Sequence, residues 1–313
     1  MTEYHIGTLD EASLAALQAG EPEAADADAA PRETFLQPKA WMKGILRTKT
    51  AVSPDSKIFT FDLEHADQRV GLPVGQHLMM RLRDPVTREA IIRAYTPISD
   101  AATARGRLDV LIKIYRGTGP KGQGGGKMTQ ALDAIPLGHF VDFRGPVGKF
   151  EYLGRGLCAL SSSTGGGRRR VRRFVMVCAG SGVTPIYQVL RAVMSDAADL
   201  THCLVLDGSR AEPDILLRAE LDALAAADPA RCRLLHALSR PSDSWTGIRG
   251  RMDRALFESE VGPPPSPPPR CDGDDDDVVG GDLVLVCGPE PLEKSVREVF
   301  TDMGWKEDDL VFF

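Results

Sequence analysis

The sequence predicts a two-domain protein in which an antiparallel Greek-key β-barrel is followed by an α/β domain with a parallel, Rossmann-like sheet. Its 313 residues are enough for two domains of ordinary size. Residues 35–155 contain short strand patterns separated by turn signals, which is typical of a small antiparallel barrel. From residue 173 strand and helix patterns alternate, which indicates a parallel sheet wrapped by helices.

The composition is that of a soluble globular protein, with 42% hydrophobic and 26% charged residues. The formal net charge of −6 argues against nucleic acid as the main partner. No run of 18 or more apolar residues is present, and the first residues lack the features of a signal peptide, so no membrane segment is expected. The six cysteines form no CxxC pair, so we expect no metal site, no disulfide framework and a cytoplasmic location.

The first part of the chain divides into a tail and the barrel. Residues 1–34 pass into an Ala-, Glu- and Asp-rich stretch with few large apolar groups, and we expect a linker there. The barrel domain follows over residues 35–155 and contains one expected helix, 128–134. Its expected strands are residues 40–48, 57–63, 76–82, 91–96, 108–115 and 140–144.

Residues 156–172 are expected to form a linker or insertion between the domains. Its arginine run could bind an anion, but we interpret it as a solvated charge run. The α/β domain spans 173–313, with a Pro- and Asp-rich insertion at 262–277 that we expect to be disordered. Its expected strands are residues 174–179, 201–206, 231–238, 283–287 and 309–313, and its expected helices are residues 185–194, 216–227, 251–259 and 291–303.

The first candidate site is the heptapeptide Arg93-Ala-Tyr-Thr-Pro-Ile-Ser. Alternate residues of a strand share a face, so Arg93 and Tyr95 point one way and Thr96 the other. An arginine beside a tyrosine ring suits a ligand with both a phosphate and a flat aromatic part. The alternative is an edge strand with an exposed arginine, and this heptapeptide alone does not decide between them.

A second candidate site is the glycine run before the barrel helix. Gly125 and Gly126 allow the backbone to approach a phosphate closely, and a helix N-terminus offers free N–H groups to an anion. Lys127 and Thr129 add a charge and a hydroxyl. The alternative is a flexible loop that begins a helix.

A third candidate site is the turn after the first strand of the α/β domain. Gly180 and Gly182 predict a sharp strand-to-helix turn, and Thr184 and Pro185 begin the helix. Dinucleotide phosphates bind at this place in doubly wound sheets. Pro185 stands where the third glycine of GxGxxG would be, so the plain dinucleotide fingerprint is incomplete.

The end of the second strand of this domain carries conflicting signals for the nucleotide. Such folds distinguish a ribose diol from a 2′-phosphate at this place. Asp207 favours the diol, whereas Ser209 and Arg210 favour the phosphate, and both alternatives stay open.

The fourth long strand ends in a cysteine motif. Its carboxyl end places Cys287, with Gly288 and Pro289, at the expected ligand crevice. The alternative is a buried thiol that acts as a small apolar group. No base accompanies Cys287 in the sequence, so we do not expect a nucleophile.

Together these motifs resemble a known family. RAYTPIS, GGGKMT, GPVG, CAGSGVTP and CGPEP occur in the order and spacing of the ferredoxin-reductase-like flavoproteins. The chain is most similar to the cytochrome b5 reductase branch, and within it to the C-terminal flavin fragment of eukaryotic nitrate reductase. The resemblance covers residues 35–313 apart from the two insertions. Residues 4–9 also resemble the last residues of the haem-binding cytochrome b5 domain that precedes the flavin domain there.

The resemblance implies an FAD site in the barrel. Arg93 would pair with the flavin pyrophosphate, Tyr95 would lie along the isoalloxazine, and Thr96 would lie near flavin N5. Ile112 and Tyr115 match a strand that lines the flavin. The residues that would hold the pyrophosphate, largely through backbone, are Gly125, Gly126, Lys127, Met128 and Thr129.

The resemblance also implies an NAD(P)H site in the second domain. Cys287 would lie against the nicotinamide, and Phe313 matches the aromatic chain terminus that lies close to the flavin. NADH-using members tend to carry an acidic pair where this chain has Glu212-Pro213, so NADH and NADPH both stay open. The residues that would hold the nucleotide are Gly180, Gly182, Thr184, Pro185, Ser209, Arg210, Gly288 and Pro289.

The implied function is an FAD-dependent reductase that takes hydride from NAD(P)H and passes electrons singly to a cytochrome b5-type haem domain, as the reductase part of assimilatory nitrate reductase. Thr96 and Cys287 would lie nearest the reacting atoms. The first alternative is a complete soluble NADH-cytochrome b5 reductase, and the second is a non-enzymatic binding module that keeps the fold. A homodimer is expected only through upstream domains that are absent from this sequence.

Overall fold

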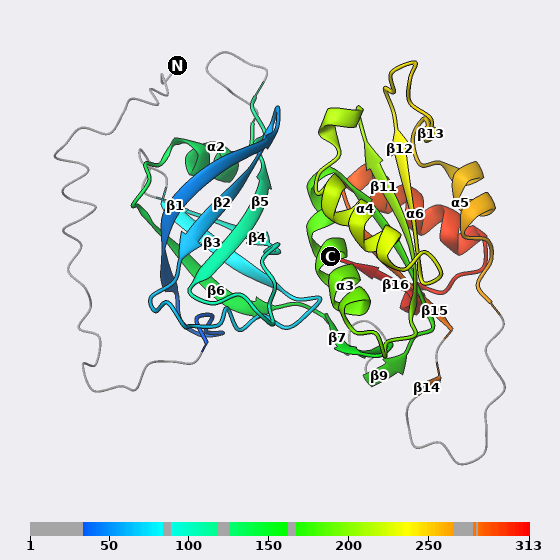
Figure 1. Cartoon of the computed structure of the whole chain (residues 1–313), viewed down its shortest axis with the longest axis horizontal. Helices are drawn as coiled ribbons and strands as arrows, with labels where there is room; N and C mark the ends of the chain where they lie inside the picture. The colour runs from blue at the N-terminus through cyan, green and yellow to red at the C-terminus, as the bar shows by residue number, and fades with distance from the viewer. Residues whose placement is uncertain (1–33, 84–88, 118–124, 162–166, 266–277, 280) are drawn as a thin grey trace.

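The computed structural model describes residues 34–83, 89–117, 125–161, 167–265, 278–279 and 281–313. These residues form two lobes, an antiparallel sheet with a short helix and a parallel sheet flanked by helices (Figure 1). Residues 1–33 of the expected tail (1–34) and residues 266–277 of the expected Pro- and Asp-rich insertion (262–277) lie outside the described residues.

The first lobe is built on a six-stranded antiparallel sheet in the order β4-β3-β6-β1-β2-β5. Because β6 lies between β3 and β1, the sheet has a Greek-key order rather than that of a simple meander. All six strands expected from the sequence are confirmed, with ends shifted by a few residues. They are β1 Met42–Ser53, β2 Ser56–Asp62, β3 His77–Arg83, β4 Ala90–Tyr95, β5 Arg107–Lys113 and β6 Phe140–Val147.

The core of the first lobe lies on one face of this sheet. Phe59 and Phe61 of β2 and Leu78 and Met80 of β3 are fully buried, and the residues between them are half-buried. This period of two is what a strand with one covered face requires. Helix α2, Lys127–Ala134, adds buried apolar side chains to the same core and begins where the glycine run ends.

The second lobe is built on a six-stranded parallel sheet in the order β13-β12-β11-β10-β15-β16. The five expected strands are confirmed, and the two-residue β13 is an addition that the sequence did not predict. The strands are β10 Arg173–Ala179, β11 His202–Ser209, β12 Cys232–Leu238, β13 Ile248–Arg249, β15 Asp282–Cys287 and β16 Leu310–Phe312.

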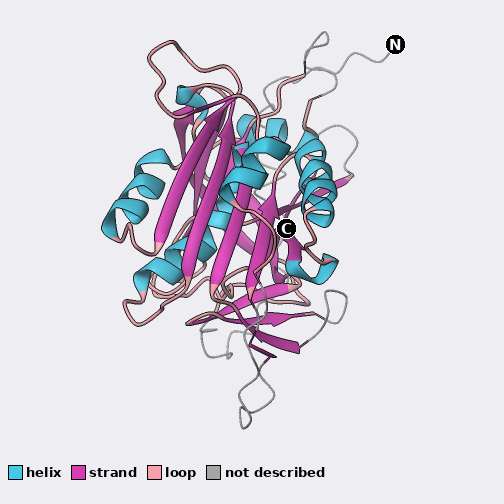
Figure 2. Ribbon diagram, turned by 90° about the vertical axis from the view of Figure 1, so that its right-hand side faces the viewer, coloured by secondary structure: helices cyan, strands magenta, loops and turns pink. Residues whose placement is uncertain are grey.

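Helices cover both faces of the parallel sheet (Figure 2). Helices α3, Val183–Ser195, and α4, Arg218–Ala227, pack into one core cluster, and α5, Arg254–Glu260, and α6, Glu290–Asp302, pack into the other. The middle of β10 is therefore buried continuously, without the alternation seen in the first lobe. The carboxyl ends of these strands meet at one edge of the sheet, where the expected nucleotide motifs lie.

A third, four-stranded sheet joins the lobes in the order β14-β9-β8-β7. Its strands β8 and β9 occupy the segment 156–172, where the sequence predicts a linker. The prediction missed β9 because it consists of a glycine and three arginines and has no apolar alternation. The strands are β7 Phe150–Gly154, β8 Leu157–Leu160, β9 Gly167–Arg170 and β14 Val278–Val279.

Arg169 of β9 corrects our interpretation of the arginine run as uniformly solvated. Its side chain is 16% exposed, and its guanidinium lies 2.8 Å from Asp309 and donates to the carbonyl of Asp282 at 2.8 Å. The ion pair attaches the small sheet to the end of the parallel sheet. Arg168 beside it is exposed, as a solvated run predicts.

Helix α3 makes direct polar contacts with the first lobe. Gln188 Oε1 accepts a hydrogen bond from the backbone of Gly75 at 2.7 Å. Arg191 donates to the carbonyl of Ile98 at 2.7 Å and to that of Ser99 at 2.8 Å. These contacts connect the helix that follows the glycine-rich turn with the loop that follows β4.

Candidate functional site

The residues of the first candidate site lie at the end of β4 and directly after it. Arg93 is exposed, and its Nη1 donates to the carbonyl of Ile92 at 2.7 Å. Tyr95 is half-buried, and burial raises the pKa of its phenol to about 12, although the charge of Arg93 acts in the opposite direction. Thr96 is 8% exposed. The strand therefore presents a cation beside a neutral aromatic ring, as its alternation predicts.

The glycine run is held close to the end of β5. A Cβ on Gly125 would lie 2.5 Å from the carbonyl oxygen of Tyr115, and one on Gly126 would lie 2.7 Å from Thr129 Oγ1. Gly126 N donates to the same Tyr115 carbonyl at 2.9 Å, and the Thr129 hydroxyl accepts from Tyr115 N at 3.2 Å. No side chain caps the start of α2, so its first N–H groups are available to an anion.

The other residues expected around the flavin divide into buried and accessible ones. Ile112 is 1% exposed and Met128 is 2% exposed, and both side chains belong to the core of the first lobe. Their side chains are therefore used in packing, and only their backbone can contribute to a binding site. Lys127 is exposed, and Tyr115 is 50% exposed with its hydroxyl 3.4 Å from Ser181 Oγ of the other lobe.

The turn after β10 is as tight as its glycines predict. Gly180 has a φ of +56°, and a Cβ on Gly182 would overlap the carbonyl oxygen of Cys287. The Thr184 hydroxyl donates to the carbonyl of Ser181 at 3.2 Å, which stabilises the first turn of α3. Pro185 lies in that first turn, and no side chain caps the helix start. The first N–H groups of α3 are therefore available to an anion, as at other uncapped helix N-termini.

Cys287 ends β15 beside Cys178, its register partner on β10. Burial raises the pKa of the Cys287 thiol to about 12, with the charge of Glu293 acting in the same direction. The thiol is therefore neutral near neutral pH. Gly288 follows it, and a Cβ there would lie 2.8 Å from Leu292 Cδ2.

The chain terminus lies next to the join between the lobes. The Phe313 ring packs edge-on against Phe150 of β7, with ring centroids 5.9 Å apart. Its backbone N–H donates to the carbonyl of Val286 at 3.0 Å, one residue before Cys287. Pro289 is the N-cap residue of α6 and lies directly before the first residue of that helix.

Asp207 is engaged by a neighbouring strand. It is 2% exposed, and its Oδ2 lies 2.9 Å from Nδ1 of His236, its register partner on β12. The Cys178 thiol donates to Asp207 Oδ1 at 3.6 Å, and His236 Nε2 lies 3.2 Å from Asp222. Although burial opposes it, hydrogen bonds and charges from the two aspartates raise the pKa of His236. The Asp207 carboxylate therefore already has hydrogen-bond partners inside the second lobe.

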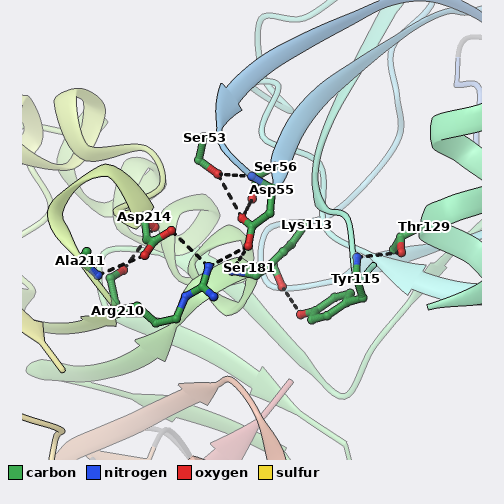
Figure 3. A network of polar contacts seen from close by, with 11 residues as sticks. Ser53, Asp55, Ser56, Lys113, Tyr115, Thr129, Ser181, Arg210, Ala211 and Asp214 are labelled. Carbon is green, nitrogen blue, oxygen red and sulfur yellow. Dashed lines mark hydrogen bonds and ion pairs between the residues drawn. The ribbon is translucent and has the colours of Figure 1, made fainter. Parts of the chain in front are cut away.

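Arg210, directly after β11, faces the first lobe (Figure 3). Its Nη2 lies 2.8 Å from Oδ2 of Asp55, in the turn between β1 and β2, and 3.2 Å from Oδ1 of Asp214. Ser209 Oγ donates to the carbonyl of Asp214 at 3.4 Å. The arginine side chain remains 55% exposed, so a further ligand can reach it.

Sequence reasoning missed the residues that join the two halves of this site. They are Asp55, Ser181, Gln188 and Arg191. Asp55 lies in a short turn between two strands, and Ser181 lies between two glycines. Nothing in the local sequence around them signals a partner on the other lobe, because each partner is distant in the chain.

The described part of the chain lacks two kinds of feature. No helix among those residues is long and apolar enough to cross a membrane. Within the same residues, no group of three or more His, Cys, Asp or Glu side chains could hold a metal ion.

Comparison with known proteins assigns a class to each lobe. The family model of the oxidoreductase FAD-binding domain matches residues 43–152, and that of the oxidoreductase NAD-binding domain matches residues 176–298. An FAD-binding antiparallel sheet followed by an NAD-binding parallel sheet defines an NAD(P)H-dependent flavin oxidoreductase of the ferredoxin-reductase-like fold. The fold class predicted from the sequence is confirmed.

The particular family follows from a solved structure. The cytochrome b5 reductase domain of Ulva prolifera nitrate reductase is 34% identical, with a TM-score of 0.76, and the match covers 90% of this chain and 100% of that one. The chain belongs to the family of cytochrome b5 reductase domains of nitrate reductase.

Longer relatives agree with this assignment. "Nitrate reductase [NADPH]" of Beauveria bassiana is 59% identical over 313 residues, which are 100% of this chain and 33% of the relative. "Nitrate reductase [NADPH]" of Fusarium oxysporum is 54% identical over 99% of this chain and 32% of the relative. The chain therefore spans about a third of the length of these curated relatives.

Proposed function

We propose that the chain takes hydride from NADPH onto FAD and passes electrons singly to a cytochrome b5-type haem, as the reductase part of an assimilatory nitrate reductase. The observation that carries the proposal is the meeting of the two candidate sites across the lobe interface, where Tyr115 Oη lies 3.4 Å from Ser181 Oγ. A flavin and a nicotinamide bound on the two sides would lie close together, as hydride transfer requires.

The residues of the first lobe suit FAD. Arg93 offers an exposed cation to the pyrophosphate, and the uncapped start of α2 offers backbone N–H groups with Lys127 beside them. Tyr95 offers a neutral ring to the isoalloxazine, and Thr96 a hydroxyl near it. When bound, FAD accepts a hydride and releases electrons one at a time, which is the chemistry that the protein itself lacks.

The residues of the second lobe suit a nicotinamide dinucleotide. The turn at Gly180 and Gly182 and the first turn of α3 would bind its pyrophosphate, with Thr184 and Pro185 shaping that turn. We assign Cys287 to contact with the nicotinamide through a neutral thiol, since burial keeps its pKa far above the working range. Its role is to position the ring rather than to donate a proton.

Among the nucleotides we assign NADPH. The carboxylate that would bind a ribose diol, that of Asp207, is buried against His236, whereas the guanidinium of Arg210 is partly exposed at the same sheet edge. Ser209 lies directly beside it. The relatives from Beauveria bassiana and Fusarium oxysporum carry NADPH in their names, which supports the same choice.

The electron acceptor and the homodimer contacts are proposed from the longer relatives. We propose a cytochrome b5-type haem domain as the electron acceptor, and homodimer contacts in regions that this chain does not span. A cytoplasmic location fits the free thiols of the described cysteines, which are Cys158, Cys178, Cys203, Cys232 and Cys287.

An anaerobic visible spectrum of the purified chain tests this function. Titration with NADPH should bleach a flavin spectrum at lower concentration than NADH, and soluble cytochrome b5 should then be reduced. Equal or better bleaching by NADH would favour the alternative of an NADH-cytochrome b5 reductase. A folded protein that stays colourless after addition of FAD would contradict the proposal and favour a non-enzymatic binding module.

A further inference from the structure

The Arg210 side chain is shared between the two lobes. Its partner Asp214 belongs to its own lobe, four residues along the chain, whereas Asp55 belongs to the other lobe, 155 residues away. The Asp55 contact is the shorter one, 2.8 Å against 3.2 Å. The cation expected to bind a 2′-phosphate is therefore already paired with a carboxylate from the flavin lobe (Figure 3).

The Asp55 carboxylate is held firmly by its own lobe. Ser53 and Ser56 donate to its Oδ1 at 3.2 and 3.1 Å, and Lys113 Nζ lies 3.0 Å from its Oδ2. Although partial burial acts in the opposite direction, the hydrogen bond and charge of Lys113 lower the pKa of Asp55. The carboxylate is thus ionised near neutral pH and cannot rotate away without losing several partners.

The charges around Arg210 make this contact relevant to nucleotide choice. Asp55 and Asp214 face one guanidinium, and Lys113 contacts the same Asp55 oxygen, Oδ2, as Arg210 does. A phosphate that approaches Arg210 either displaces Asp55, which breaks the ion pair, or lies beside Asp55, which brings two negative charges together, and both cost free energy. A ribose diol carries no charge and does not compete for the guanidinium.

We propose that Asp55 is a specificity-determining residue that lowers the affinity for NADPH, and not that for NADH, by competing with the 2′-phosphate for Arg210. The proposal rests on the proposed function in one respect, namely that the 2′-phosphate binds Arg210. Because Asp55 lies on the flavin lobe, binding of the 2′-phosphate also weakens a contact between the lobes. Nucleotide choice is thereby linked to the lobe interface.

The substitution Asp55→Asn tests the proposal in the flavin-loaded protein. Asparagine keeps the size and can still accept from Ser53 and Ser56, but it removes the competing charge. Dissociation constants of NADP⁺ and NAD⁺ are measured by titration of the flavin absorbance or by calorimetry. We expect NADP⁺ to bind about three- to fivefold more tightly, in keeping with a partly exposed ion pair, and NAD⁺ to change by less than about twofold.

Two further variants test whether the change in NADP⁺ affinity comes from the pair of Asp55 with Arg210. Asp62→Asn removes the same charge from a pair with Arg47 elsewhere in that lobe and should leave both dissociation constants unchanged. In an Arg210→Met background, Asp55→Asn should no longer alter NADP⁺ binding. This result would show that the effect of Asp55→Asn on NADP⁺ affinity depends on its pair with Arg210. Raising the salt concentration should reduce the gain from Asp55→Asn, because screening weakens the competition.

The results that contradict each proposal differ. Weaker NADP⁺ binding in Asp55→Asn would overturn the inference, since Asp55 would then orient Arg210 instead of competing for it. Unchanged NADP⁺ binding, with flavin content equal to the parent, would also overturn it. If Arg210→Met binds NADP⁺ as the parent does, the proposed NADPH site itself is wrong, and the inference falls with it.

Discussion

Gly182 stands where the turn after β10 comes closest to the end of β15. A Cβ at this position would overlap the carbonyl oxygen of Cys287 and lie 2.9 Å from Gly288 N. Both neighbours are backbone atoms, so no change of rotamer relieves the overlap. At the scale of single residues, the absence of a side chain thus sets the distance between the proposed phosphate turn and the residue expected beside the nicotinamide.

Replacement of Gly182 by alanine should displace this turn. We expect a loss of about 1–3 kcal/mol of the free energy of unfolding, because the overlap forces a backbone shift. NADPH should bind more weakly, while the flavin content stays that of the parent. Chemical denaturation and nucleotide titration measure the two effects.

Gly281→Ala is the matched control for this variant. Among the described residues, a Cβ there would meet Pro265 Cγ, at an ordinary contact distance of 3.6 Å, so stability and NADPH binding should not change. Tight nucleotide binding by Gly182→Ala would show that the close approach to Cys287 is not needed.

His236 makes a pH-dependent contribution to stability. Asp207 and Asp222 raise its pKa in the folded protein above the unfolded value of about 6.5. A raised pKa stabilises the fold fully below the unfolded value, and this contribution is lost as the pH rises through the folded value. The difference in free energy of unfolding between the parent and His236→Gln should therefore be larger at about pH 6 than at about pH 9.

Urea denaturation at both pH values measures this difference. His202→Gln is the control, because His202 is an exposed histidine at the start of β11 that makes no contact with Asp207 or Asp222. A difference between parent and His236→Gln that does not depend on pH would show that the charged form of His236 gains nothing from its two aspartates.

At the scale of elements, helix α2 is positioned by hydrogen bonds to the backbone at the end of β5. The Thr129 hydroxyl accepts from Tyr115 N at 3.2 Å and donates to the Gly126 carbonyl at 3.1 Å. One side chain thus connects the strand end, the glycine run and the first turn of the helix. The N–H groups proposed to bind the flavin pyrophosphate depend on that connection.

Thr129→Val keeps the shape of the side chain and removes both hydrogen bonds. A lost hydrogen bond of this kind is worth about 1 kcal/mol, so we expect FAD to bind about fivefold more weakly. Reconstitution of the flavin-free protein with FAD, followed by fluorescence, gives the dissociation constant.

The same substitution at Thr50, an exposed position of β1, serves as the control and should not change FAD binding. Equal affinities of Thr129→Val and the parent would mean that the helix start is held without this hydroxyl.

At the scale of the whole molecule, the reaction depends on how the two lobes are placed. Arg191 of α3 donates to two consecutive carbonyls in the loop after β4, those of Ile98 and Ser99. Gln188, one turn earlier, accepts from Gly75. The helix that begins the proposed nucleotide site is therefore fastened to the loop that follows Tyr95 and Thr96.

Arg191→Met should loosen this attachment without removing either binding site. Hydride transfer is sensitive to small misplacements, so we expect the rate of anaerobic flavin reduction by saturating NADPH to fall about tenfold. Stopped-flow absorbance measures this rate, and the flavin content should equal that of the parent.

Arg251→Met, at an exposed arginine on the second lobe, should leave the rate unchanged. If Arg191→Met reduces flavin as fast as the parent, the contacts of α3 with the first lobe do not control the alignment of the two sites.

Much of this architecture was predictable from local pattern. The period of two in β2 and β3 and the continuous apolar runs of β10 and β15 distinguish the two kinds of sheet before any contact is known. The small third sheet was not predictable, because β9 is three arginines after a glycine and β14 is two residues long. Such strands form because neighbouring backbone completes their hydrogen bonds, and the sequence carries no signal for that.

The sequence by itself determined the two lobes, their order, and the turns at Gly180, Gly182 and Gly126, because periodicity and backbone freedom are local properties of the chain. Only the tertiary structure decided how the charges pair. Asp207 and Arg210 are near neighbours in the chain, yet their side chains face different partners. The Asp207 carboxylate faces His236 inside the second lobe, and the Arg210 guanidinium faces Asp55 across the interface. Ion pairing depends on distance through space, and the fold alone sets that distance.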